Sequence, residues 1–110
     1  MKYILFLTLI LSGLIANAAN VENTPEITSS SKVEMYTALF WAPCKEAKAL
    51  LQSRGIEFET YNVTFSRTNA KAMKKRSGGR MDVPQIFVDD LYFGDLAALK
   101  SYFTTNTKTE

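Results

Sequence analysis

Residues 33–48, VEMYTALFWAPCKEAK, decide the fold, because they read as a strand that passes through a short loop into a helix. Side chains alternate in character over residues 33–38, which is typical of a strand, whereas the apolar residues within 47–51 recur at helical spacing. Pro43 suits the first turn of a helix, where its missing N–H costs nothing. Cys44, the only cysteine of the chain, is therefore expected in that first turn, where unpaired amides and the helix dipole favour a thiolate. Any chemistry is expected at this junction.

Length and composition exclude several classes of protein. A chain of 110 residues supports one small domain. Its net charge of +2 is too weak to indicate nucleic-acid binding, and no basic stripe is interleaved with aromatic residues, so we expect no nucleic-acid partner. With no histidine and a single cysteine, no metal site is expected either.

The first residues predict export. Residues 1–18 resemble a secretory signal, with Lys2 as the charged start, an apolar run over 3–16 and a small-x-small cleavage site at 16–18. The mature chain would begin at Ala19, be secreted or periplasmic, and have no membrane association after cleavage. An uncleaved anchor is the alternative, although the run is shorter than the roughly 20 residues of a spanning helix. An oxidising compartment would leave the single cysteine unpaired.

The rest of the chain predicts further strands and helices from apolar periodicity and turn residues. Residues 19–32 are polar and are interpreted as a flexible tether, and residues 104–110 as a polar tail. Asp95 is predicted to cap the last helix. The first two strands should pair in parallel, because a helix connects them. The expected elements are strands near 33–38, 57–63, 85–88 and 91–93, and helices after Pro43, at about 69–77 and after Asp95.

Two segments resemble a known family. AKALL at 47–51 and VPQIFV at 83–88 are similar to the corresponding segments of glutaredoxins, and the likeness covers residues 33–103. The resemblance implies an α/β, thioredoxin-like fold with a four-stranded mixed sheet flanked by three helices. It also implies that Pro84 is cis beside the redox centre, and that Val83 offers its backbone to the cysteinyl part of glutathione as an added strand.

The same resemblance assigns positions at the start of the first helix. Counting back from Leu51 places Cys44 on the family's second, resolving cysteine and Trp41 on its first, nucleophilic one. The dithiol is thereby broken, and Cys44 remains as the one candidate catalytic residue. Trp41 either covers apolar surface, which we favour, or stacks on a bound peptide or flat ligand. The family's lysine before the nucleophile is replaced by Ala38.

Further glutathione contacts are implied near the last helix. Gly94 and Asp95 remain from a longer family loop that binds the γ-glutamyl end of glutathione, and could still receive an α-amino acid group. Arg67 and Lys71 are candidates for contact with the glycine carboxylate, although such a basic cluster is most often a solvated face.

Three functional interpretations stay open. The leading one is an exported glutaredoxin-like protein of redox homeostasis whose Cys44 forms mixed disulfides with glutathione or a partner-protein thiol, or links two copies into a dimer. No cofactor would be bound, and glutathione would be a co-substrate. The alternative is a redox-inactive module that binds peptides or proteins beside Pro84. A third interpretation makes Cys44 a buried core thiol, since free cysteine often behaves as a small hydrophobe. Whether the chain is an enzyme stays open.

Overall fold

The computed structural model describes residues 24–107. The predicted leader, the first part of the predicted tether and the last residues of the predicted tail lie outside the described residues. The chain forms β1 (Val33–Thr37), α3 (Ala42–Ser53), β2 (Glu59–Asn62), α4 (Arg67–Arg76), β3 (Gln85–Val88), β4 (Leu91–Gly94) and α5 (Leu96–Thr107).

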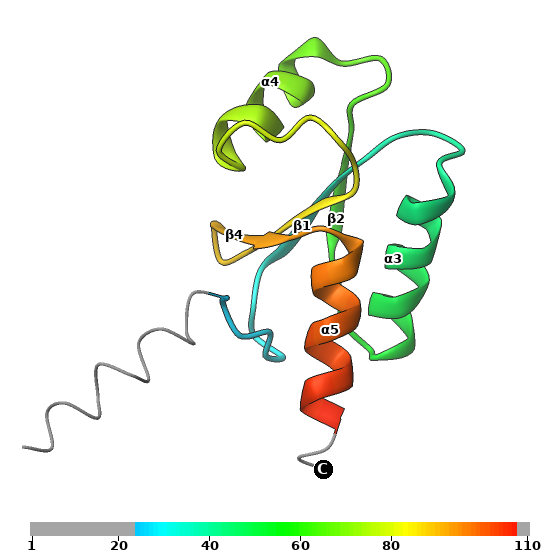
Figure 1. Cartoon of the computed structure of the whole chain (residues 1–110), viewed down its shortest axis with the longest axis vertical. Coiled ribbons are helices and arrows are strands. Elements are labelled where there is room, and N and C mark those ends of the chain that lie inside the picture. Colours follow the sequence, from blue (N-terminus) through cyan, green and yellow to red (C-terminus); the bar gives the residue numbers. More distant parts are fainter. Residues whose placement is uncertain (1–23, 108–110) are drawn as a thin grey trace, which may run out of the picture.

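The four strands form one mixed sheet in the order β2-β1-β3-β4 (Figure 1). β1 pairs in parallel with β2, as predicted from the helix that joins them. β3 runs antiparallel to both β1 and β4. The predicted thioredoxin-like architecture of a four-stranded mixed sheet and three helices is confirmed.

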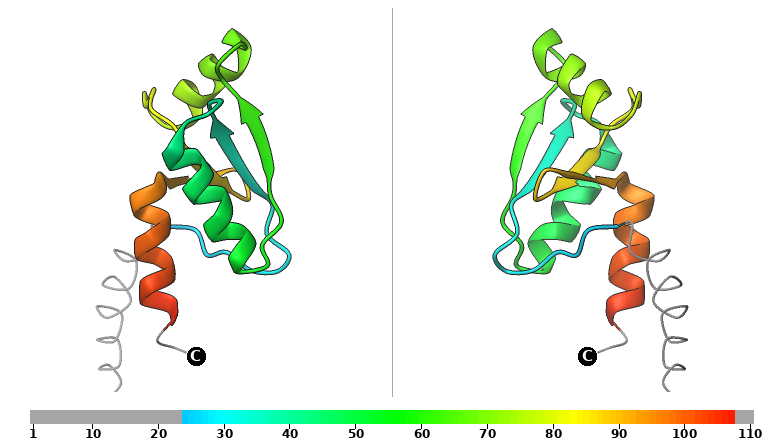
Figure 2. Two further views of the ribbon diagram at one scale, coloured as in Figure 1. Left: turned by 90° about the vertical axis from the view of Figure 1, so that its right-hand side faces the viewer. Right: turned by 90° about the vertical axis from the view of Figure 1, so that its left-hand side faces the viewer.

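Helices cover both faces of the sheet. α3 and α5 pack side by side against one face, and α4 lies over the other at the upper end of the molecule (Figures 1 and 2). All five residues of β1 are buried as a result. The main core joins residues from the sheet, α3 and α5: Val33, Met35, Ala47, Leu51, Ile86, Val88, Phe93, Leu99 and Phe103.

A buried carboxylate lies beneath α4. Glu34 in β1 accepts hydrogen bonds from Arg76 at 2.8 Å and from the Tyr61 hydroxyl at 2.9 Å. Burial by itself would raise the pKa of Glu34, but these two partners outweigh it and hold the pKa below its usual range. The charged side chain thus fits into the sheet because α4 and β2 supply its donors.

The helix boundaries differ from the predicted ones for local reasons. α4 begins at Arg67 rather than near 69, because the Ser66 hydroxyl accepts the Asn69 N–H at 3.1 Å and caps the helix. α5 continues to Thr107, into the predicted polar tail. β2 spans only Glu59–Asn62, shorter than the predicted strand.

The residues just before β1 contact the domain. The Ile27 N–H donates to the Tyr102 hydroxyl at 2.9 Å, and the Lys32 N–H donates to Asp89 at 2.8 Å. These contacts extend the packed part of the chain to Ile27, whereas the sequence interpretation began the domain at residue 33. Within residues 24–107, no helix is long and apolar enough to cross a membrane.

Candidate functional site

The candidate site begins where β1 gives way to α3. Trp41 has an extended backbone and is the N-cap of α3, and its carbonyl accepts the N–H groups of Cys44 and Lys45 at 3.0 and 3.2 Å. Pro43 lies in the first helical turn, as predicted. Cys44 therefore lies in the first turn of the helix, but only 1% of its surface is exposed to solvent.

Burial governs the acidity of this thiol. It raises the pKa of Cys44 above its ordinary value, and the opposing influences of the Ala38 backbone and the Lys48 charge do not reverse the shift. Since the thiolate is the nucleophile, the raised pKa leaves little reactive sulfur at neutral pH. From the sequence, the helix start was expected to favour a thiolate, whereas burial is the larger influence in the structure.

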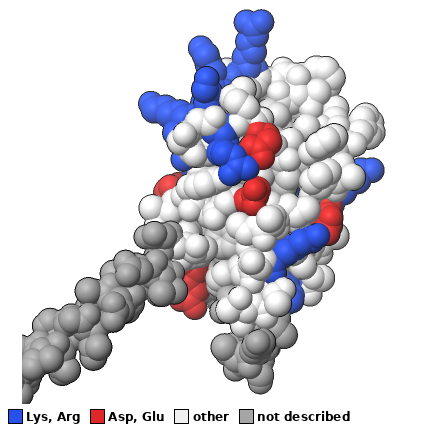
Figure 3. Space-filling model, viewed as in Figure 1, with Lys and Arg blue, Asp and Glu red and all other residues white. Residues whose placement is uncertain are grey.

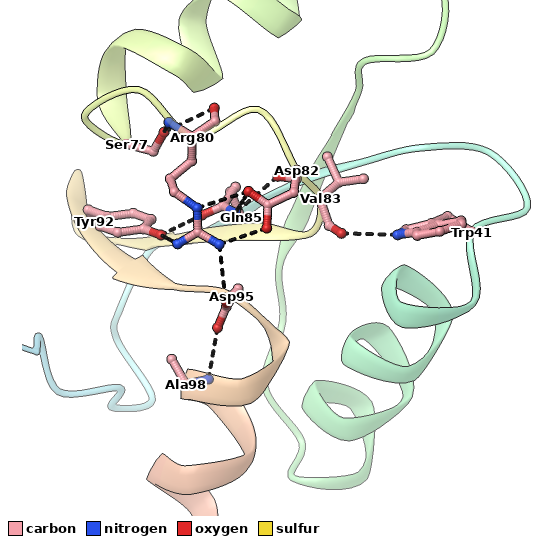
Figure 4. Close-up of polar contacts among 9 residues, drawn as sticks. All are labelled: Trp41, Ser77, Arg80, Asp82, Val83, Gln85, Tyr92, Asp95 and Ala98. Carbon is pink, nitrogen blue, oxygen red and sulfur yellow. Dashed lines mark hydrogen bonds and ion pairs between the residues drawn. The ribbon is translucent and has the colours of Figure 1, made fainter.

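The Trp41 indole bridges the helix entrance to the proline loop. Its Nε1–H donates to the Val83 carbonyl at 3.1 Å, while half of the residue stays exposed to solvent. The Val83–Pro84 peptide bond is cis, as predicted. The indole thus takes up the carbonyl of Val83, the residue whose backbone was expected to pair with a bound strand (Figure 4).

Asp95 caps the last helix, and its carboxylate forms an ion pair with a basic side chain. Its carboxylate accepts the Ala98 N–H at 3.0 Å, which confirms the predicted cap, and pairs with Arg80 at 3.1 Å. The Ala98 bond is the largest cause that holds the pKa of Asp95 below its usual range, and Arg80 adds to it against the opposing effect of burial. Gly94 precedes it with a φ of +141°, in the region that favours glycine.

Arg80 connects the proline loop to the start of α5. Its guanidinium donates to Asp82 at 2.7 and 2.9 Å, to the Tyr92 hydroxyl at 3.1 Å, and to Asp95 (Figure 4). The buried Gln85 completes this group, since it accepts from Tyr92 at 2.6 Å and donates to the Asp82 carbonyl at 2.9 Å. We call Arg80, Asp82, Gln85, Tyr92 and Asp95 the Arg80 cluster.

A family model described as Glutaredoxin matches residues 33–93. The chain belongs to the glutaredoxin family. It is 38% identical over 65 residues to a probable glutaredoxin of Synechocystis, covering 59% of this chain and 74% of that protein. It is 42% identical over 72 residues to glutaredoxin 3 of Escherichia coli strain K12, covering 63% of this chain and 86% of the relative.

A solved structure agrees with the fold. The crystal structure of a buckwheat glutaredoxin–glutathione complex superimposes with a TM-score of 0.62, at 13% identity, over 86% of this chain and 83% of that one. At this identity the likeness supports the thioredoxin-like fold alone.

The structure brings the predicted glutaredoxin site residues together in two groups. Trp41 contacts Val83 beside Pro84, and Asp95 joins the Arg80 cluster. Arg67 and Lys71 are exposed on α4, and their contact with an anion stays a prediction.

Sequence reasoning missed Arg80, which links the proline loop to Asp95. A signal existed, because Arg80 and Asp82 lie two positions apart immediately before the proline strand, a spacing that suits a local ion pair. The partner Asp95 is fifteen residues away and could be found only from the fold.

Proposed function

We propose that this glutaredoxin is an exported protein of thiol–disulfide chemistry whose site is reduced to a single, slow cysteine, Cys44. The family membership supports the reaction class. The presence of one cysteine in the whole chain excludes an intramolecular dithiol cycle. Glutathione, or a thiol of a partner protein, is the proposed co-substrate.

The proposed reaction is one thiol–disulfide exchange. The Cys44 thiolate attacks one sulfur of a disulfide such as oxidised glutathione, the S–S bond breaks, and the other half leaves as a thiolate. A second external thiol must then attack the mixed disulfide to regenerate Cys44. No electrons are gained or lost overall, because one disulfide replaces another at each step.

The observation that carries the proposal is the position of Cys44 in the first turn of α3, next to the loop that contacts Val83. Burial of the same residue supports a slow rate, since both the disulfide and the base that removes the proton must reach a covered thiol. We expect adduct formation over hours rather than seconds.

Intact-mass spectrometry under non-reducing conditions tests the proposal. Incubation with oxidised glutathione should add one glutathione per chain over hours, or yield a disulfide-linked dimer, and Cys44→Ser should abolish both products. The proposed thiol–disulfide exchange is wrong if Cys44 stays unmodified in the native protein and reacts only after unfolding. As a control for folding, the variant should keep the thermal midpoint of the parent within a few degrees.

A second candidate function is a redox-inactive binding module, and Trp41 at the position of the family's nucleophilic cysteine favours it, because an indole cannot attack a disulfide. The indole already takes one backbone acceptor of the strand edge, so a bound peptide would compete with it. Failure of the glutathione test, combined with peptide binding that Val83→Pro weakens by removing a backbone donor, would assign this function instead.

Export is the other part of the proposal, and the apolar run over residues 3–16 with its cleavage site supports it. Intact mass of the protein from its own host should correspond to a chain that begins at Ala19. A soluble cytoplasmic protein that begins at Met1 would contradict it.

A further inference from the structure

Large apolar side chains gather in the loops at one end of the molecule. Five of the six large hydrophobic residues that are exposed within residues 24–107 belong to the β1–α3, β2–α4 and α4–β3 loops. The sixth, Leu91, is the first residue of β4, directly after the β3–β4 turn. We call the five the apolar rim: Leu39, Phe40, Trp41, Phe65 and Met81.

Hydrogen bonds hold the three loops of the apolar rim together. The Leu39 N–H donates to the Thr64 hydroxyl at 2.9 Å, which joins the β1–α3 loop to the β2–α4 loop. The Trp41 indole reaches Val83 and so joins the first loop to the segment that follows Met81. The rim is therefore one surface at the upper end of the sheet.

The two phenylalanines of the rim protrude rather than pack. Phe40 and Phe65 are 87% and 84% exposed. Phe40 also has a φ of +57°, a left-handed conformation that is strained for a bulky residue. A strained backbone that directs an apolar ring into solvent is a feature expected of a contact surface rather than of a folding core.

Positive charge adjoins the rim. Residues 60–81 contain six basic residues and no acidic one. Arg76 and Arg80 pair with carboxylates. The remaining four are exposed on α4 and take part in none of the ion pairs of the described chain: Arg67, Lys71, Lys74 and Lys75. Figure 3 shows Lys and Arg side chains standing out over α4 at the upper end of the molecule.

We propose that the apolar rim and the basic face of α4 bind the surface of an anionic phospholipid bilayer. Phe40 and Phe65 would enter the headgroup boundary while the cations of α4 contact lipid phosphates. A bilayer fits better than an acidic protein, because the rings protrude from loop tips. A cavity of about 630 Å³, lined by residues within 26–31, 54–57 and 102–103, lies at the other end of the molecule. This proposal replaces the expectation of no membrane association after cleavage, and it does not depend on Cys44.

Trp41 provides the direct readout, because it is the only tryptophan of the chain and belongs to the rim. Its emission reports rim insertion whether or not the predicted leader also contacts lipid. The full chain should show a blue shift and protection from acrylamide with vesicles of phosphatidylglycerol and phosphatidylcholine in equal parts. Pure phosphatidylcholine vesicles should give neither.

Two variants separate insertion from charge. Phe40→Asn with Phe65→Ser should raise the lipid concentration at half-maximal blue shift at least about tenfold, because the variant lacks the two rings that would be buried in the bilayer. Lys71→Gln, Lys74→Gln and Lys75→Gln together should raise it by about tenfold or more, and added salt should do the same to the parent. Leu91→Asn is the matched control, an equally apolar exposed side chain away from the rim, and should change nothing.

The proposal is overturned if anionic vesicles leave the Trp41 emission unchanged, or if the double phenylalanine variant binds like the parent. An emission change with polyglutamate but not with anionic vesicles would assign the surface to an acidic protein and would likewise overturn it. Circular dichroism of each variant should match the parent, since the substituted side chains are exposed.

Discussion

At the scale of single residues, the decisive contrast is between the place of Cys44 and its surroundings. The helix entrance that lowers thiol pKa values in reactive sites is present, but the sulfur is enclosed and its pKa is raised. Trp41 precedes Cys44 by three positions, and its indole N–H donates a hydrogen bond to the Val83 carbonyl. The sequence predicted the helical position of Cys44, because Pro43 and the apolar helix pattern are local signals.

Alkylation of Cys44 should be slow at neutral pH and should accelerate with alkali. A raised pKa means that the thiolate fraction in the native state is below that of an ordinary cysteine, whose pKa is about 8.5. Iodoacetamide should therefore label the folded protein at least about tenfold more slowly than the unfolded one at pH 7.5. The folded rate should still be rising at pH 9, where an ordinary thiol levels off. Rapid labelling of the native protein at pH 7 would contradict the burial seen for this residue.

At the scale of elements, side chains distant in the sequence determine how the segments join. The β3–β4 turn and the Asp95 cap of α5 were predicted from turn residues and periodicity, and the cis Pro84 from the resemblance to the family. The full burial of β1 was not predictable in this way, because Glu34 needs Arg76, forty-two positions later, as its partner. Likewise, the Arg80 cluster exists only once the fold brings Asp95 to the proline loop.

Gly94→Ala should destabilise the protein more than its position at the end of a strand indicates. An added Cβ would come within 2.6 Å of the Ala98 Cβ, and the φ of +141° is itself unfavourable for alanine. We expect a loss of about 2 kcal/mol or more in the free energy of unfolding by urea. Gly55→Ala is the control, since its φ of +70° is also positive but its Cβ would meet open space. It should lose only about 1 kcal/mol. Equal losses in the two variants would mean that α5 yields at Ala98.

Arg80→Gln should lower the free energy of unfolding at neutral pH and make that free energy less dependent on pH in the acidic range. The pKa values of Asp82 and Asp95 lie below their usual range in the folded protein, with Arg80 the largest cause for Asp82. Their contribution is therefore complete above an unfolded pKa of about 4 and is lost as the pH falls through the lower folded values. At pH 7 we expect a loss of about 1 kcal/mol, allowing for solvent screening of a partly exposed guanidinium.

The difference between Arg80→Gln and the parent should then shrink in urea titrations between pH 4 and about pH 2. Lys100→Gln is the control, because it removes an exposed ion pair with Glu46 and should leave stability nearly unchanged. A constant difference at every pH would mean that Arg80 acts through packing rather than through its carboxylate partners.

At the scale of the whole molecule, the fold was predictable from two sequence segments that resemble the family. The chain is a glutaredoxin by its sequence, and its structure has the thioredoxin-like fold. The chemistry of the site is less accessible from sequence, because burial of Cys44 and the contacts of Trp41 and Arg80 are products of packing. The apolar rim was also invisible from the chain alone, since its members lie in three separate loops that only the sheet unites.

Trp41 is proposed to occupy the position of the nucleophile in a glutaredoxin dithiol, with Cys44 in the position of its partner cysteine. Trp41→Cys tests it most directly. Under oxidised glutathione, the variant should form an intramolecular bridge between the introduced cysteine and Cys44, seen in non-reducing mass spectrometry as a loss of two hydrogens that dithiothreitol restores. Phe40→Cys, one position earlier and directed into solvent, should keep two unbridged cysteines. Failure of Trp41→Cys to bridge, or bridging by Phe40→Cys alone, would contradict the register on which the account rests.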